Sequence, residues 1–313
     1  MDRIIDPLSD LGFKFLFGRE KISEPVLKDL LNALLYDSDD FEEITSVKYL
    51  NNERSAEWKD GKSIRYDILC QTESKHRFIV EMQKASQPKF IDRATFYVAR
   101  GIAEQGYRGK KEEEKEWDYE LEPVIGVFIC NSHIRGLNKK PIVKASTLDE
   151  ETLQPIGTKT RYIFVQLASF KKTEDECESL DDKWIYNIKN MGIRQEVAFR
   201  QNSDIFKRLA EVANVATLTP EQRYHYEADV KMARDTLNQI RGAYEDGEEI
   251  GERRGLEIGR AEGRAEGRAE GELIERKKSI CMMLSFGIQP KQIADKYGIS
   301  ELEVMQIAES NEE

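Results

Sequence analysis

The chain has 313 residues, of which 39% are hydrophobic, which is enough to bury a sizeable core in about two domains. A net charge of -11 at pH 7 argues against a protein whose whole surface attracts nucleic acid. The sequence contains no run of about 18 apolar residues and no basic start followed by an apolar stretch, so it predicts neither a membrane span nor a signal peptide.

The N-terminal region predicts two packed helices. Ser9 or Asp10 can cap the first, which is strongly apolar and ends or loosens at Gly18. The second is expected from about residue 24 to 35, with Pro25 in its first turn. Both helices present apolar residues at helical spacing, so we expect them to cover a sheet.

Three strands are predicted next, over residues 44–50, 65–70 and 77–83. The last two form a hairpin, and a turn centred near Ser74 sets Asp67 directly across the ladder from Glu81. Because side chains alternate along a strand, Glu81 and Gln83 share one face, while Val80 and Met82 point to the other.

The two carboxylates at this position have two interpretations. Buried together, they are costly unless a proton or cation neutralises them, and Mg²⁺ binds through one or two carboxylates while it keeps several waters. Alternatively, Asp67 and Glu81 are ordinary solvent-exposed residues on one face of the sheet, without a functional role.

A basic segment follows this pair. Between Lys84 and Lys111 the chain has seven Lys or Arg residues and two acidic residues, which suits either a DNA-facing surface or an ordinary solvated helix face. Apolar spacing predicts a helix over about 88–107, and Arg93 on it could bind a phosphate bidentately or pair with Asp92 or another acid. Apolar runs at 123–130 and 161–167 predict two more strands.

The chain resembles the PD-(D/E)XK nuclease-fold family of recombination-promoting nucleases and transposases. The residues that carry the resemblance are the stretch from Asp6 to Gly18, Asp67, the Glu81-Met82-Gln83 strand, Arg93, Tyr97 and Gln105. The resemblance covers roughly the first two thirds of the chain. It implies an α/β fold with an αβββαβ core, in which helices flank a mixed sheet. Periodicity alone shows only a mixed α/β domain.

The resemblance implies a metal-dependent DNA endonuclease in which Asp67 and Glu81 hold Mg²⁺, or Mn²⁺ in its place. Gln83 stands where many relatives have lysine, and a neutral amide can orient water but supplies no positive charge. Lys14 could supply that charge, although it could equally be an exposed helix lysine. A second possibility is a nuclease-fold protein that has lost cleavage and binds nucleic acid or protein, and a third is an oligomeric scaffold.

Supporting roles are implied for four further residues, and for three of them an alternative remains open, as already stated for Arg93. Asp10 could act near the catalytic patch or only cap its helix, and Gln105 could contact the site or make a helix-end hydrogen bond. The candidate substrate-binding residues are Asp10, Arg93, Tyr97 and Gln105.

Beyond about residue 180 the chain becomes helical and charged. Thr219, Pro220 and Gln222 predict the start of a helix that runs toward Tyr244. Glycine then recurs at every fourth position, at Gly247, Gly251, Gly255, Gly259, Gly263, Gly267 and Gly271.

In a helix these glycines form one stripe, flanked by arginine on one side and glutamate on the other. Opposite charges meet across a parallel pair of such helices, so the repeat predicts a parallel homodimer, with a right-handed wrap because a four-residue interval exceeds the helical period of about 3.6. The alternative is a flexible charged linker.

The tail resembles a helix-turn-helix in its spacing. Gly287 and Gly298 end helices, Pro290 begins one, and Ser300 with Glu303 forms a capping box for the last. That last helix carries no Lys or Arg, which favours protein contact over DNA reading. The predicted regions are a nuclease-like domain over 1–200, a helical region over 201–245, the glycine repeat over 246–272 and the small tail over 273–313.

The cysteines and histidines argue against a zinc site and a catalytic triad. The four cysteines lie far apart, and with three histidines and no CxxC or HExxH spacing there is little to build a zinc site or a catalytic triad. We therefore expect reduced thiols in a cytoplasmic protein.

Overall fold

The computed structural model describes residues 3–36, 42–54, 64–108, 119–157 and 159–310. The chain divides into two compact units, Met1–Arg234 and Asp235–Glu313.

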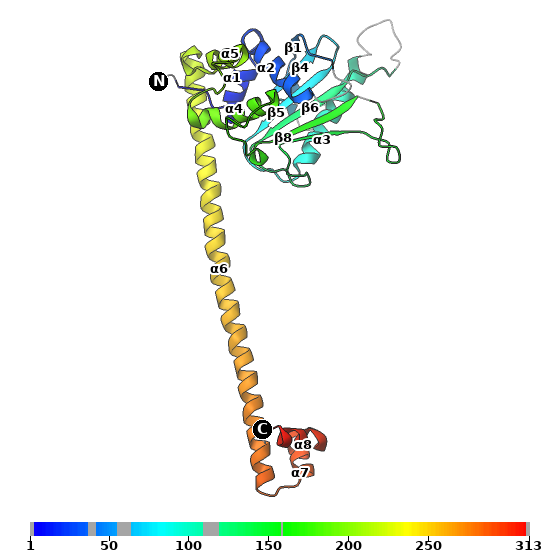
Figure 1. The fold of residues 1–313 in the computed structure, drawn as a ribbon, viewed down its shortest axis with the longest axis vertical. Helices are drawn as coiled ribbons and strands as arrows, with labels where there is room; N and C mark the ends of the chain where they lie inside the picture. The colour runs from blue at the N-terminus through cyan, green and yellow to red at the C-terminus, as the bar shows by residue number, and fades with distance from the viewer. Residues whose placement is uncertain (1–2, 37–41, 55–63, 109–118, 158, 311–313) are drawn as a thin grey trace. The chain divides into compact units, whose positions relative to one another are not determined.

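A six-stranded sheet forms the centre of the first unit (Figure 1), in the order β1-β4-β5-β6-β8-β7. The strands β1, β4 and β5 are antiparallel, β5, β6 and β8 are parallel, and β7 returns antiparallel at the edge. The bounds are Val47–Tyr49 for β1, Ile68–Thr72 for β4, Arg77–Gln83 for β5, Val124–Cys130 for β6, Ile142–Ser146 for β7 and Thr160–Gln166 for β8. A separate two-stranded ribbon joins β2 (Glu53–Arg54) to β3 (Ile64–Arg65).

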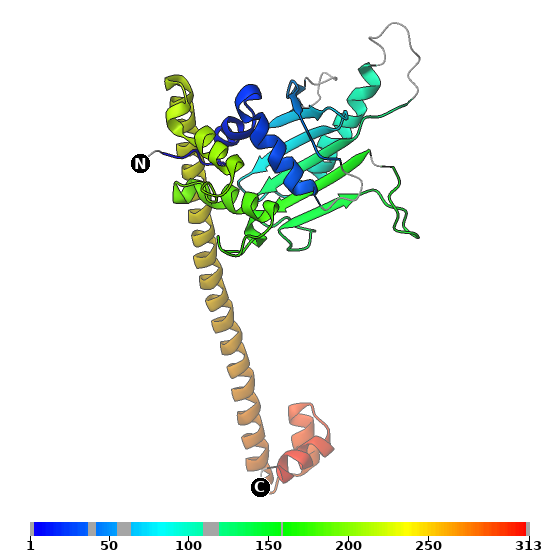
Figure 2. The same ribbon diagram turned by 45° about the horizontal axis from the view of Figure 1, so that its top comes forward.

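Helices cover both faces of the sheet (Figure 2). One face packs against α1 (Asp10–Phe17), α2 (Glu20–Leu35), α4 (Leu180–Arg194) and α5 (Asp204–Ala213). The other face packs against α3 (Phe90–Arg108), which connects β5 to the parallel β6. Two short 3₁₀ turns, η1 (Leu167–Ser169) and η2 (Val215–Thr217), complete the unit. The predicted α/β fold with an αβββαβ core is confirmed.

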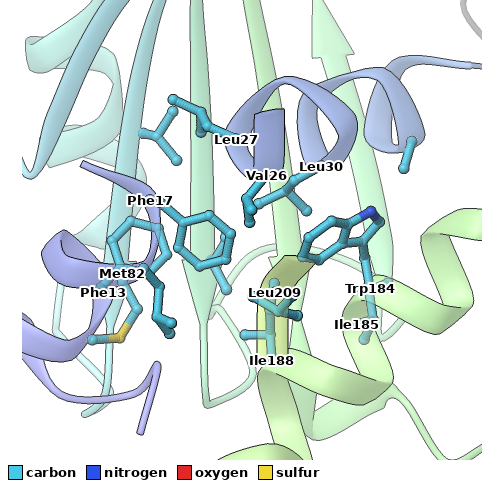
Figure 3. Packing of buried hydrophobic residues seen from close by; sticks show 14 of the residues in the cluster. Phe13, Phe17, Val26, Leu27, Leu30, Met82, Trp184, Ile185, Ile188 and Leu209 are labelled. Carbon is cyan, nitrogen blue, oxygen red and sulfur yellow. The ribbon is translucent and has the colours of Figure 1, made fainter. Parts of the chain in front are cut away.

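The larger core lies between the sheet and the four helices (Figure 3). Trp184 is fully buried there, with ring centroids 6.1 Å from Phe17 and 5.1 Å from Phe206. Its indole N–H donates to Asp29 at 2.7 Å, so its one polar atom is satisfied inside the core. Met82 joins this core from β5.

A smaller core lies under α3, where backbone approach is close. An added Cβ at Gly126 of β6 would lie 2.4 Å from the ring of Phe128 on the same strand and 2.8 Å from the side chain of Val98 on α3. Glycine at 126 therefore leaves room for both side chains between the sheet and α3.

Two local predictions were wrong. Helix α2 begins at Glu20, so Pro25 lies inside it, and the start is fixed because the Arg19 backbone N–H donates to Ser23 Oγ at 3.3 Å. The predicted continuous strand over 65–70 is broken at Tyr66 and Asp67. The Asp67 N–H donates to a side chain rather than to a strand partner.

The second unit contains most of α6 (Pro220–Ser285), which begins in the first unit, together with α7 (Pro290–Tyr297) and α8 (Glu301–Glu309). The predicted capping boxes are confirmed at both Thr219 with Gln222 and Ser300 with Glu303. The glycine repeat is helical, and helix α6 passes through it without interruption.

Ile280, Ile293, Ala294 and Val304 form a small core where α7 and α8 fold against the end of α6. Within the described ranges, none of the helices combines the length and the apolar character that a membrane span needs.

Candidate active site

Asp67 and Glu81 meet where β4 begins and β5 nears its end. The register pairs Ile68 with Val80, so Asp67 stands opposite Glu81 one position further on, as predicted. The Asp67 N–H donates to Glu81 Oε1 at 3.0 Å, and the Met82 N–H donates to Asp67 Oδ2 at 3.0 Å. Each carboxylate therefore has one oxygen held by a backbone amide of the neighbouring strand.

The second oxygen of each carboxylate faces a cation from a different helix. Lys14 of α1 places Nζ 3.3 Å from Asp67 Oδ1, and Arg93 of α3 places a guanidinium nitrogen 3.6 Å from Glu81 Oε2. The Glu81 side chain is only 3% exposed, whereas those of Lys14 and Arg93 are 31% and 34% exposed. The cluster is thus a buried Glu81 beside a partly buried Asp67, whose side chain is 17% exposed, with two partly exposed cations around them.

Burial makes this pair hard to ionise fully. It raises the pKa of Glu81 to about 8, and the negative charge of Asp67 adds to the effect. The pKa of Asp67 is also raised by burial, against the opposing effects of the Met82 N–H and Lys14. Two carboxyl groups with raised pKa values in one patch are typical of a functional site or a cation site.

Tyr97 and Gln83 border the pair. The Arg93 Nε donates to the Tyr97 hydroxyl at 3.1 Å, and burial, followed by the charge of Glu81, raises the pKa of Tyr97. Gln83 lies two positions beyond Glu81 on the α3 face of β5, while Val80 and Met82 enter the opposite core, as predicted. Within the part of the chain that the structure describes, the Gln83 side chain makes no hydrogen bond, so its amide is available to a ligand.

Asp10 and Gln105 stand apart from this pair in different ways. Asp10 is exposed in the first turn of α1, where Ser9 provides the cap, and its charge reaches Asp67 through space. The Gln105 amide donates to the Glu122 carbonyl at 3.0 Å and accepts the Glu122 N–H at 2.7 Å. Glu122 pairs with Arg77 at the opposite end of β5 from Glu81, so Gln105 has a structural hydrogen bond.

Arg93 pairs with Glu81 rather than with Asp92, and it also donates to Gln87 at 2.7 Å. The Arg93 guanidinium therefore lies beside Glu81, and the Arg93 side chain is partly exposed. Of the basic segment predicted from the sequence, Lys110 and Lys111 lie outside the described residues.

The donor set fits a hard divalent cation. Among the described residues, no three His, Cys, Asp or Glu side chains come together in a way that could hold a metal ion. Two carboxylates with raised pKa values suit Mg²⁺, which is commonly bound by one or two carboxylates and completed by water and substrate phosphate oxygens.

Two residues that hold the N-terminal part of α1 were not predicted from the sequence. Tyr226 and Asp229 of α6 hydrogen-bond to the segment that leads into α1, from 218 or more positions away. A contact over this separation leaves no local pattern in the sequence.

Comparison with known proteins gives one match. A family model described as PD-(D/E)XK nuclease family transposase matches residues 7–243. Neither the curated proteins nor the solved structures include a match to the chain.

Proposed function

Since the chain belongs to the PD-(D/E)XK nuclease family of transposases, we propose that it is a metal-dependent DNA endonuclease that hydrolyses phosphodiester bonds and can promote recombination. The observation that carries this proposal is the buried pair of Asp67 and Glu81, with raised pKa values and a cation on each. Such a pair is costly to the fold unless protons or cations neutralise it, and a divalent cation would do so together with Lys14 and Arg93.

Asp67 and Glu81 would hold Mg²⁺, or Mn²⁺ in its place. When bound, the metal supplies positive charge that stabilises the phosphate transition state and lowers the pKa of water. Lys14 supplies the positive charge that Gln83 lacks, and its amine lies 3.3 Å from Asp67 Oδ1. The Gln83 amide would orient the attacking water, and Arg93, supported by Tyr97, would bind a phosphate oxygen of the DNA.

Incubation of the purified protein with supercoiled plasmid and Mg²⁺ is expected to give nicked circles. Asp67→Ala should lower the nicking rate on the order of a hundredfold or more, because one of the two carboxylates for the cation is lost. Gel electrophoresis of time points measures the rate.

The matched control is Asp92→Ala, which removes an exposed carboxylate from α3 and should leave the nicking rate unchanged. Equal nicking by wild type and Asp67→Ala would indicate a contaminating nuclease. DNA binding without any nicking would favour the second function, a nuclease-fold binding module. Gln83 in place of lysine and the net charge of -11 are both consistent with that function.

A second pair of variants tests the source of the positive charge. Lys14→Met is expected to lower the nicking rate about a hundredfold, because it removes the cation beside Asp67, whereas Gln83→Leu should lower it about tenfold or less. Lys21→Met, at an exposed lysine of α2, is the control. Equal losses in Lys14→Met and Gln83→Leu would refute the assignment to Lys14.

We also propose a parallel homodimer through the glycine stripe of α6, which would present two sites, as double-strand cleavage requires when each site cuts one strand. Outside the adjoining backbone of the helix itself, an added Cβ at any of the seven repeat glycines would meet no atom of the described residues within 4 Å. The stripe thus has no packing role within one chain that would require glycine. A cytoplasmic location belongs to the same proposal, and the four free cysteines suit it.

A further inference from the structure

The segment that leads into α1 and the first turn of α1 are hydrogen-bonded to the first turns of α6. The Asp6 N–H donates to the Tyr226 hydroxyl oxygen at 2.7 Å, and the Leu11 N–H donates to Asp229 Oδ2 at 3.0 Å. Tyr226 and Asp229 are three positions apart on one helix, so both lie on the face that meets this segment. Tyr226 is 2% exposed, and its ring belongs to the core of the first unit.

These contacts matter for α1 because the helix is short. Eight residues form little stable helix by themselves, and the first N–H groups need acceptors from outside the helix. Ser9 Oγ accepts the Gly12 N–H at 3.0 Å, and Asp229 accepts that of Leu11. The Asp229 carboxylate also interacts favourably with the positive end of the α1 dipole.

Lys14 lies one helical turn after Leu11, so the placement of α1 sets the placement of its amine. The contact between Lys14 Nζ and Asp67 Oδ1 is 3.3 Å. A displacement of α1 by about 1 Å would lengthen this contact beyond ion-pair range, and errors of this size at a reacting group are costly.

We propose that Asp229, with Tyr226 beside it, is a positioning residue for Lys14: it holds the N-terminus of α1 where the lysine amine meets Asp67. The effect on catalysis rests on the proposed nuclease function. The effect on the Lys14 amine does not, and the two can be measured separately.

The placement of Lys14 is measured on the full chain by reductive methylation of lysines with ¹³C-formaldehyde and NMR of the dimethylamine signals. The Lys14 signal is identified as the one absent from Lys14→Arg, and Asp67→Ala gives its position without the partner carboxylate. Asp229→Ala is expected to move the signal toward the Asp67→Ala position. Asp235→Ala, at an exposed aspartate further along α6, should leave it in place.

Two milder variants keep the test decisive if Asp229→Ala does not fold. Asp229→Asn retains an oxygen acceptor for the Leu11 N–H and should keep the Lys14 signal near its wild-type position. Tyr226→Phe removes only the acceptor of the Asp6 N–H, and should move the signal in the same direction as Asp229→Ala but less far.

Activity gives the second measurement. Asp229→Ala is expected to lower kcat about tenfold with little change in KM, and Asp229→Asn to recover most of the loss. An unmoved Lys14 signal in Asp229→Ala and Tyr226→Phe, with a clear movement in Asp67→Ala, would overturn the positioning role. If wild type itself cleaves nothing while the signal moves as expected, the nuclease proposal fails and the positioning role stands.

Discussion

Glu81→Gln is expected to slow cleavage strongly and at the same time to stabilise the protein at alkaline pH in the absence of metal. Glutamine keeps the oxygen that accepts the Asp67 N–H at 3.0 Å but removes the negative charge. Metal binding by calorimetry should be lost, and the nicking rate should fall on the order of a hundredfold or more. Arg93 loses its partner but is 34% exposed, so water can solvate it.

The stability change follows from the pKa of Glu81, which burial and Asp67 raise from 4.5 to about 8. The folded state therefore holds this proton after the unfolded chain has released it. Stability from the group is fully present below about pH 4.5 and is lost as pH rises toward about 8, by about 1.4 kcal/mol for each pH unit in that interval. Glu81→Gln removes this dependence.

Urea unfolding of wild type and Glu81→Gln from pH 5 to pH 9 measures the difference. As pH rises, the free energy of unfolding of the variant should increase relative to that of wild type. Mg²⁺ should stabilise wild type but not the variant. Parallel pH profiles of the two proteins, or equal stabilisation of both by Mg²⁺, would contradict the site. The control is Glu43→Gln, because Glu43 is an exposed glutamate. Glu104→Gln is unsuitable because Glu104 pairs with Arg100.

Leucine at Gly259, Gly263 and Gly267 is expected to convert a dimer into a monomer while making the helix of each chain more stable. In one chain, a Cβ at these positions meets nothing within 4 Å, and replacing glycine in a helix gains about 1 kcal/mol per position. Loss of the dimer would then be due to the leucine side chains, which would prevent the backbones of two copies of the helix from approaching closely.

Light scattering on the full-length protein gives the mass, and circular dichroism gives the helix content. The matched control places the same three leucines at Ala261, Ala265 and Ala269, on the side of the helix opposite the glycines. Deletion of the residues after Glu245 should also give a monomer. A dimer that survives both the glycine substitutions and this deletion would refute association through the stripe.

Much of the fold follows from local patterns in the sequence. Val124–Cys130 is buried along its whole length, and a continuous apolar run of that length predicts a central strand. The edge strand β7 was not predicted, because Ile142 and Val143 are only partly buried and the next three residues are exposed. The start of α2 was misplaced because arginine, which is not a typical cap residue, occupies the position before it.

The candidate site could be predicted where one hairpin determines it. Asp67 and Glu81 face each other because the turn between β4 and β5 is symmetric about Ser74. Lys14 came from a resemblance to a family, since no periodicity links α1 to β4. Gln105 could not be assigned from the sequence, because an amide serves equally well at a site or at a backbone turn.

The parallel strands have one more consequence, for the loop that follows β6. In the sheet register, Gln83, Cys130 and Gln166 lie side by side, and the Asn131 N–H donates to the Gln83 carbonyl at 2.9 Å. The buried amide of Gln166 accepts the Ile134 N–H and donates to the carbonyls of Asn138 and Lys140. The Gln166 side chain thus holds three points of the loop, at residues 134, 138 and 140, so substitutions at exposed loop positions should leave the strands undisturbed.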